Sequence, residues 1–289
     1  MRVSITLLTS RVNDLVIPLP SVPALPHSRT SELIGDQPLS ARSVLASALL
    51  GSDQGRLTVA ELVAVASLFG ISAGAARTCL WRMVSNGELT GDEGSYALAG
   101  RLSERRLRVD EASRIDDVAT HRWDGTWELA IVSLERRAAA DRLELRKAAL
   151  ALHLAELREG VWIRPDNLDP QRLPASQAVL DQQCTHFHGA ASDITADKVG
   201  SLFSLADWTD DARALIEAMD AQLKPRKRAG SSFRYEFALS IAVVRHLQLD
   251  PLLPVELIGG NWPGHTLRGT YRRFDSALKQ RMNRAFRRT

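Results

Sequence analysis

The sequence predicts an α+β protein of several domains. Three observations support this class: three capped helices and a hairpin near the N-terminus, strands that alternate with helices in the middle, and a basic, helical C-terminal part. The chain has 289 residues, of which 45% are apolar and 25% charged, a composition that suits two or three globular domains. We expect a tail over 1–38, domains over 39–100, 121–205 and 206–289, and a connector helix over 101–120.

Composition and spacing exclude several classes of protein. No run approaches the ~18 uninterrupted apolar residues that a membrane span needs, so we expect no membrane contact. Arg11, Asn13 and Asp14 interrupt the apolar runs of the N-terminus, which has no secretory cleavage pattern, and we therefore expect a cytoplasmic protein. Cys79 and Cys184 are too few for a disulfide framework, and no CxxC zinc signature occurs in the sequence.

The net charge of +3 is unevenly distributed along the chain. Residues 224–289 contain 14 basic and 4 acidic residues, whereas 121–223 contain 11 basic and 17 acidic ones. A basic part of this size favours contact with a polyanion, either nucleic acid or a phosphate-bearing ligand such as a coenzyme. A solvated basic tail is the alternative interpretation of the last helix.

The elements of the first domain follow from capping signals. Residues 1–38 contain five prolines without sustained periodicity, which predicts a disordered tail. Beyond it, the T-x-x-E capping box of Thr58 and Glu61 is the clearest helix signal. The three predicted helices begin after Ser40, Thr58 and Ser72 and end at Gly51, Gly70 and Asn86-Gly87.

Two short extended runs follow, on either side of the turn Gly91–Gly94, and predict a hairpin. Three helices and a hairpin within about 60 residues are typical of a winged helix-turn-helix. The faces of the third helix fit this interpretation. One arc, expected to pack inward, is formed by Ala76, Leu80, Met83 and Val84; the opposite arc is formed by Thr78, Arg82 and Ser85, with Arg77 and Trp81 on a flank.

The middle of the chain alternates between strand and helix. We predict a strand over 126–134, a helix over 135–157, a strand over 160–165 and another strand within 177–190. A helix capped by Thr209 or Asp210 follows. This order resembles a ferredoxin-like α/β unit that lacks a clear last strand. The charged connector over 101–120 is expected to be solvated; a further helix precedes Pro251, and a loop over 258–267 leads to the final basic helix.

Two enzymatic or metal-binding interpretations have weak support. Cys184, His186 and His188 alternate on one predicted strand, a set that suits zinc, but no fourth ligand is evident. A nuclease needs a carboxylate at the end of the first central strand, where the sequence has Ser133 and Leu134 before Glu135. We therefore expect no catalysis, cofactor or metal. The tryptophans at 123, 127, 162 and 262 could line an aromatic pocket or form part of the core.

Three stretches of the sequence resemble one known family. These are GISAGAARTCLWRMVSNGEL, then WDGTWELAIV followed by LREGVWIRP, and finally LDPLLPVELIGGNWPG. In this order they are similar to the phenylacetate-degradation repressors, the PaaX-like transcriptional regulators. The resemblance extends from Leu39 to Leu278 and leaves the Pro-bearing N-terminal extension outside it.

The resemblance implies a homodimeric repressor of an operon for aromatic-acid catabolism, bound to a palindromic DNA operator. It also implies a central domain similar to small CRISPR-associated nucleases, and release from DNA by an aryl-acyl-CoA thioester such as phenylacetyl-CoA. A ligand-responsive activator or a global regulator is the alternative, and a nuclease-like enzyme is the third candidate. The expected DNA contacts are Ser72, Arg77, Thr78, Arg82 and Ser85, with Gly94 and Ser95 in the wing, where Asp92 and Glu93 are an unusual acidic tip.

The effector contacts are predicted from charge and aromatic content. A coenzyme A thioester needs basic side chains for its phosphates beside an apolar slot for the acyl group. Trp262 in the NWPG turn lies near three arginines of the following helix, Arg268, Arg272 and Arg273. We expect these four residues to bind the effector.

Overall fold

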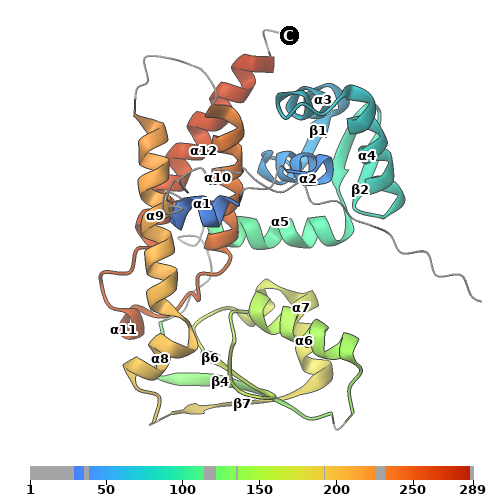
Figure 1. Cartoon of the computed structure of the whole chain (residues 1–289). Coiled ribbons are helices and arrows are strands. Elements are labelled where there is room, and N and C mark those ends of the chain that lie inside the picture. Colours follow the sequence, from blue (N-terminus) through green and yellow to red (C-terminus); the bar gives the residue numbers. More distant parts are fainter. Residues whose placement is uncertain are drawn as a thin grey trace, which may run out of the picture.

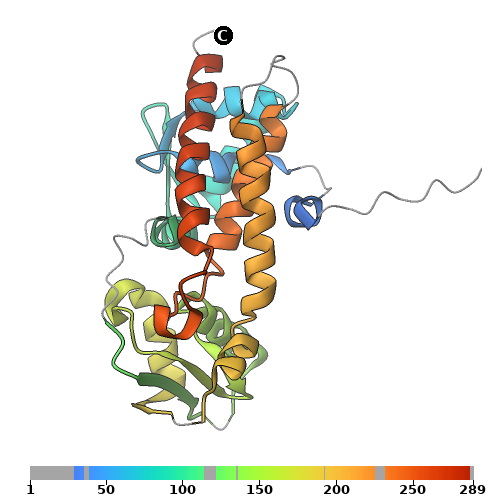
Figure 2. The same ribbon diagram turned by 90° about the vertical axis from the view of Figure 1, so that its left-hand side faces the viewer.

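The computed structural model describes residues 29–35, 39–113, 122–134, 136–191, 193–224 and 232–286. It has three parts, which Figures 1 and 2 show from two sides. We call residues 41–98 the N-terminal unit and residues 126–190 the central unit. The C-terminal bundle is formed by the long helices α9 (Leu205–Leu223), α10 (Ser232–Leu247) and α12 (Gly264–Phe286).

The N-terminal unit contains the three predicted helices and the predicted hairpin. Its elements are α2 (Ala41–Gly51), β1 (Arg56–Thr58), α3 (Val59–Leu68), α4 (Ala73–Ser85), β2 (Leu89–Asp92) and β3 (Ser95–Leu98). All three N-caps are confirmed: the side chains of Ser40, Thr58 and Ser72 each accept a hydrogen bond from a backbone N–H of the first turn. Glu61 completes the capping box of α3.

Strand β1 was not predicted from the sequence. Its three residues pair antiparallel with β3, and the sheet order is β1-β3-β2. Such a short strand forms because the edge of the hairpin offers it unpaired backbone groups. The three helices pack together on a core that includes Leu45, Leu49, Leu62 and Leu80.

Helix α5 (Gly100–Ser113) forms the first part of the predicted connector helix. The expectation of full solvation is wrong, because Leu102, Val109 and Ala112 are buried. Arg106 also donates hydrogen bonds to the carbonyl oxygens of Ser52 and Asp53, at 2.6 and 3.1 Å, and so ties α5 to the turn after α2. The rest of the predicted connector, 114–121, lies outside the described residues.

The central unit contains two elements that the sequence analysis did not predict, a second strand and a second helix. Its order is β4 (Thr126–Val132), α6 (Ala139–Ala151), β5 (Ala155–Arg158), β6 (Val161–Pro165), α7 (Pro174–Gln183) and β7 (Cys184–Ala190). The predicted helix over 135–157 is therefore too long, because β5 occupies its end. The strand predicted within 177–190 begins only at Cys184, because α7 precedes it. With β5 and α7 added, the strand predicted within 177–190 becomes β7, the last strand of the unit.

The four central strands form one antiparallel sheet, in the order β5-β6-β4-β7. One face packs against α6 and α7 and buries Trp162. The other face buries Trp127 and Ile163 against Val199 of α8 (Ala196–Leu202) and Leu253, which precedes α11 (Val255–Ile258). Trp127 and Trp162 are therefore core residues, which agrees with the structural interpretation of these two side chains.

The ends of the bundle differ from the prediction in two places. Helix α9 begins at Leu205 rather than after Thr209 or Asp210, and its N-cap Ser204 adopts a left-handed conformation (φ 49°) without a side-chain cap. Residues Arg29–Ile34, predicted to belong to a disordered tail, form α1, whose Arg29 pairs with Asp211 of α9. Residues 1–28 and 36–38 of that tail lie outside the described residues. None of the helices in the described ranges is both long enough and apolar enough to cross a membrane.

A buried polar cluster joins α5 to the central unit. Arg172 Nη1 lies 2.6 Å from Glu111 Oε1, and His153 Nε2 lies 3.8 Å from Glu111 Oε2. Burial lowers the pKa of His153, and the neighbouring Glu111 only partly opposes this effect. Burial raises the pKa of Glu111, but His153 and Arg172 more than offset that effect, so the pKa lies below its usual value.

This cluster predicts a loss of stability in mild acid. A histidine whose pKa is lower in the folded state stabilises the fold above its unfolded pKa of about 6.5, and this contribution is lost as the pH falls. We expect the free energy of unfolding of the parent, measured by urea denaturation, to fall between about pH 7 and pH 5. His153→Asn should reduce that dependence, since asparagine tolerates the φ of 61° at this position but does not titrate. Equal pH dependence in both proteins would contradict the assignment to His153.

Candidate nucleic-acid interface

Helix α4 presents a polar face on the outside of the N-terminal unit. The predicted inward residues Ala76, Leu80 and Met83 are buried, and Val84 is half-buried. The opposite face consists of exposed side chains: Arg77, Thr78, Trp81, Arg82 and Ser85. Helix α4 packs on α2 and α3, and it lies on the side of the N-terminal unit that faces away from the bundle (Figure 1). A large ligand can therefore reach the exposed face.

The two arginines on this face carry charge that the described protein does not neutralise. Within the ranges that the structure covers, neither Arg77 nor Arg82 makes a side-chain hydrogen bond or an ion pair. By contrast, the nearby Arg42 binds Glu88 through its guanidinium, and Glu88 Oε2 accepts from Arg42 Nε at 3.0 Å. The free guanidinium groups of α4 suit phosphate oxygens or guanine edges.

Two of the hydroxyl groups expected to contact DNA, those of Ser72 and Ser85, have local roles. Ser72 caps α4, where its Oγ accepts from Ala75 N at 3.2 Å. Ser85 Oγ donates to the carbonyl oxygen of Trp81 at 3.1 Å and keeps its lone pairs exposed. The cap also leaves the first turn of α4 at the surface, and backbone N–H groups at a helix N-terminus favour a phosphate.

The β2–β3 hairpin presents an acidic tip. Positive φ angles at Glu93 (37°) and Gly94 (83°) form its tight turn. Ser95, an expected DNA contact, is engaged within the hairpin: it donates to Asp92 O at 2.9 Å and accepts from Arg56 Nη1 at 2.8 Å. Arg56 lies on the unpredicted strand β1 and is the basic residue of this wing that the sequence analysis missed.

The four expected effector contacts fall into two groups. Trp262 and Arg268 line one cavity of about 440 Å³, together with apolar side chains of the 252–258 segment. Trp262 stacks on Trp208 with ring centres 4.3 Å apart. Arg272 and Arg273 are exposed on α12 and do not line that cavity, and Arg273 Nη2 lies 3.5 Å from Asp220.

The histidines considered for zinc have carboxylate partners instead. His186 lies 3.4 Å from Glu128 and 3.1 Å from Asp181, and His188 Nδ1 lies 3.0 Å from Asp166. In the part of the chain that the structure describes, no group of three or more potential ligands is placed to hold a metal ion. Strand β4 ends at Val132, and the adjacent Glu135, considered for a nuclease, lies outside the described residues.

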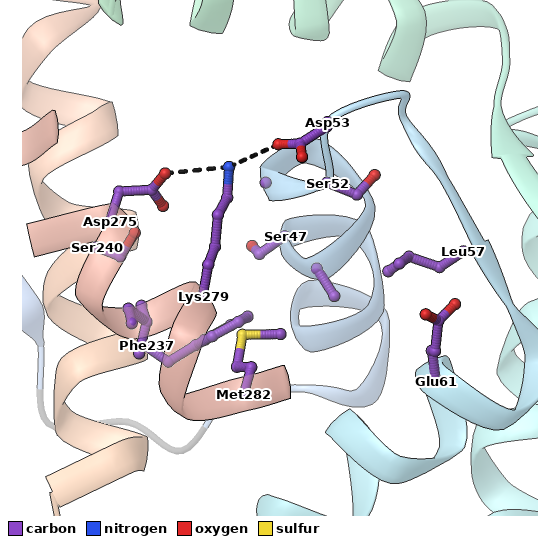
Figure 3. A pocket seen from close by; sticks show the side chains of 13 residues that line it. Ser47, Ser52, Asp53, Leu57, Glu61, Phe237, Ser240, Asp275, Lys279 and Met282 are labelled. Carbon is purple, nitrogen blue, oxygen red and sulfur yellow. Dashed lines mark hydrogen bonds and ion pairs between the residues drawn. The ribbon is translucent and has the colours of Figure 1, made fainter. Parts of the chain in front are cut away.

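A second cavity lies between the N-terminal unit and the bundle. It measures about 190 Å³, and Figure 3 shows Lys279 of α12 reaching across it. Lys279 Nζ lies 3.0 Å from Asp53 of the N-terminal unit and 3.1 Å from Asp275 of α12. Burial raises the pKa of Asp275, although Lys279 opposes this effect. Phe237 of α10 also lines this cavity, and the centre of its ring lies 5.1 Å from the centre of the Phe69 ring.

Models of one protein family match almost the whole described chain. Residues 40–105 match the PaaX-like protein model, 120–199 match the PaaX protein central Cas2-like domain, and 203–288 match the PaaX-like protein C-terminal domain. These ranges agree with the N-terminal unit, the central unit and the bundle.

A solved structure supports the same relationship. The chain is similar to "Uncharacterized protein Rv0674 from Mycobacterium tuberculosis", with 35% sequence identity and a TM-score of 0.64, over 85% of this chain and 98% of the other. No curated protein matches this chain. On the three domain models, the chain belongs to the PaaX-like family of transcriptional regulators.

Proposed function

We propose that this protein is a dimeric transcriptional repressor that binds DNA through its N-terminal unit. The observation that carries the proposal is the outward face of α4, where Arg77 and Arg82 have no hydrogen-bond or ion-pair partner among the described residues. The element order, with β1 between α2 and α3 and the β2–β3 hairpin directly after α4, supports a winged helix-turn-helix. In that arrangement α4 is the recognition helix in the major groove.

Arg82 and Arg77 should contribute differently to DNA binding. We expect Arg82→Ala to cost on the order of 1–3 kcal/mol of operator binding and to relax the preference at one base pair. Arg77→Ala should weaken binding evenly across sequences, because a phosphate contact carries no sequence information. Gel shifts on the promoter of the gene's own neighbourhood, with single-base operator variants, measure both effects.

Arg213→Ala is the matched control, since Arg213 is an exposed arginine on α9, away from α4. It should bind the promoter as the parent does. If Arg77→Ala and Arg82→Ala also bind like the parent, α4 is not the DNA-contacting helix. A promoter fragment that is cut rather than shifted would instead favour the nuclease-like enzyme.

Dimerisation would let two copies of α4 contact a palindrome. One winged helix offers few contacts, and a twofold axis doubles them. We infer that the central unit is ferredoxin-like, as its β-α-β-β-α-β order and antiparallel sheet support, and that it holds the dimer together with the bundle.

The expected assembly is a dimer in solution. Sedimentation equilibrium of the full chain should give twice the mass of 31.8 kDa. A fragment ending near Thr120 should be monomeric and bind the promoter poorly, because it lacks the proposed dimer contacts. A dimeric, tightly binding N-terminal fragment would contradict this assignment.

We propose further that an aryl-acyl-CoA thioester releases the protein from an operon for aromatic-acid catabolism. The cavity lined by Trp262 and Arg268 also contains the apolar side chains Leu253, Val255 and Ile258, which suit an aryl acyl group. Asp250, which lines the same cavity, pairs with Arg268, so the phosphates of the ligand need other basic groups. Arg272 and Arg273 follow Arg268 by about one turn of α12, where basic side chains suit the phosphates of coenzyme A. Release requires that the ligand binds the DNA-free conformation more tightly than the DNA-bound one.

The thioester and the free acid should therefore differ. Phenylacetyl-CoA should bind in calorimetry and lower promoter affinity, whereas phenylacetate and coenzyme A alone should do neither. Replacing Arg272 and Arg273 by Glu should abolish the response while ligand-free DNA binding remains. Binding of the free acid alone would refute the thioester assignment. An activator or global regulator would be recognised by lower transcription of its targets after deletion of the gene.

A further inference from the structure

The most exposed large hydrophobic side chain of the described residues is Trp81 of α4, which is 68% accessible. Within the described ranges its indole ring makes no hydrogen bond and no contact with another aromatic ring. Large aromatic side chains are usually well buried, so an indole this accessible indicates a partner that covers it. The core of the N-terminal unit does not use Trp81, since Leu80 and Met83 fill the opposite side of α4.

The neighbours of Trp81 indicate the chemistry of that partner. Arg77 lies one helical turn before it, Ser85 lies one turn after it, and Arg82 follows it directly. Along the axis of α4 the indole therefore lies between Arg77 and Ser85, and it belongs to the exposed polar face. Two guanidinium groups that have no partner in the part of the chain the structure describes flank it, and this arrangement favours a polyanion over an apolar protein surface.

We propose that Trp81 packs against thymine methyl groups in the major groove and selects A·T pairs beneath the middle of α4. The proposal rests on the DNA-binding function proposed above and assigns a specificity-determining residue to it. The thymine 5-methyl is the apolar group that base pairs present in the major groove. Side chains that wedge between base pairs enter from the minor groove, which is too narrow to admit a helix.

Gly74 supports a close approach of α4 to the groove. It lies one turn before Arg77 and Thr78, is exposed, and has no atom within 4 Å of the position that a Cβ would occupy. The first turn of α4 therefore presents backbone rather than side chain at its outward face. This lets the helix descend far enough for the indole to reach the methyl groups.

The test compares thymine with uracil in the promoter duplex that the full-length protein shifts. Replacing every thymine by uracil removes the methyl groups and keeps the Watson–Crick edges. Fluorescence anisotropy titrations use the parent, Trp81→Ala, Trp81→Phe and the control Leu249→Ala, which removes a side chain 66% accessible at the end of α10. Thermal unfolding checks that each variant is folded.

We expect Trp81→Ala to weaken binding to the thymine duplex by about five- to a hundredfold. The parent should lose a similar factor on the uracil duplex, whereas Trp81→Ala should bind both duplexes equally, since the two changes remove the same contact. Trp81→Phe should be intermediate, and Leu249→Ala should behave as the parent.

Several results would overturn the assignment. Equal binding of the parent to both duplexes would show that Trp81 does not contact the methyl groups, even though the DNA-binding function stands. A Trp81→Ala variant with normal DNA binding but an altered mass in sedimentation would show that the indole contacts another protein chain. If the parent shifts no promoter fragment, the proposed function fails, and the role of Trp81 fails with it.

Discussion

The packing of the C-terminal bundle against α5 and the central unit depends on the buried ion pair between Arg268 and Asp250. Their side chains are 3% and 2% accessible, with Arg268 Nη1 at 2.8 Å from Asp250 Oδ2. Arg268 Nε also donates to the carbonyl oxygen of Ala112 at the end of α5, and Asp250 Oδ1 accepts from Leu252 N. Asn167 of the central unit donates to Leu252 O. One buried pair thus links the bundle to the end of α5 and, through Leu252, to the central unit. Breaking such a pair by removing one partner typically costs about 3–5 kcal/mol.

Capping signals made the helices of the N-terminal unit predictable from the sequence. Short elements that form only through tertiary contacts could not be predicted in this way. Thr58 and Glu61 are local signals, and the structure uses both as expected. The three-residue β1 and the helix α7 carry no comparable signal, because β1 depends on pairing with β3 and α7 on packing against α6. The sequence of α7 is polar and lacks a side-chain cap. The start of α9 was misplaced because Ser204 takes a left-handed conformation that no sequence pattern specifies.

The candidate site was predictable where periodicity governs it. The helical period separated buried Leu80 and Met83 from exposed Arg82, and the structure agrees. The same procedure placed Trp81 beside Arg77 on a flank of the outward face, and both side chains are exposed in the structure. In the C-terminal part, the effector contacts were predicted from a count of basic residues, which is a weaker guide. Such a count cannot distinguish Arg268, whose charge Asp250 neutralises inside the fold, from the exposed Arg272.

If the protein binds DNA as proposed, the acidic tip of the β2–β3 hairpin bears on how that binding responds to ionic strength. Each DNA phosphate that a protein neutralises releases counterions. This makes the slope of log affinity against log salt concentration more negative by about 0.9. Asp92 and Glu93 repel phosphates, and Arg56 is already bound to Ser95 within the hairpin. Few counterions are therefore displaced on this side of the complex. In the proposed complex, affinity that comes from base contacts rather than from counterion release would be retained as the salt concentration rises, and discrimination between DNA sites would be retained with it.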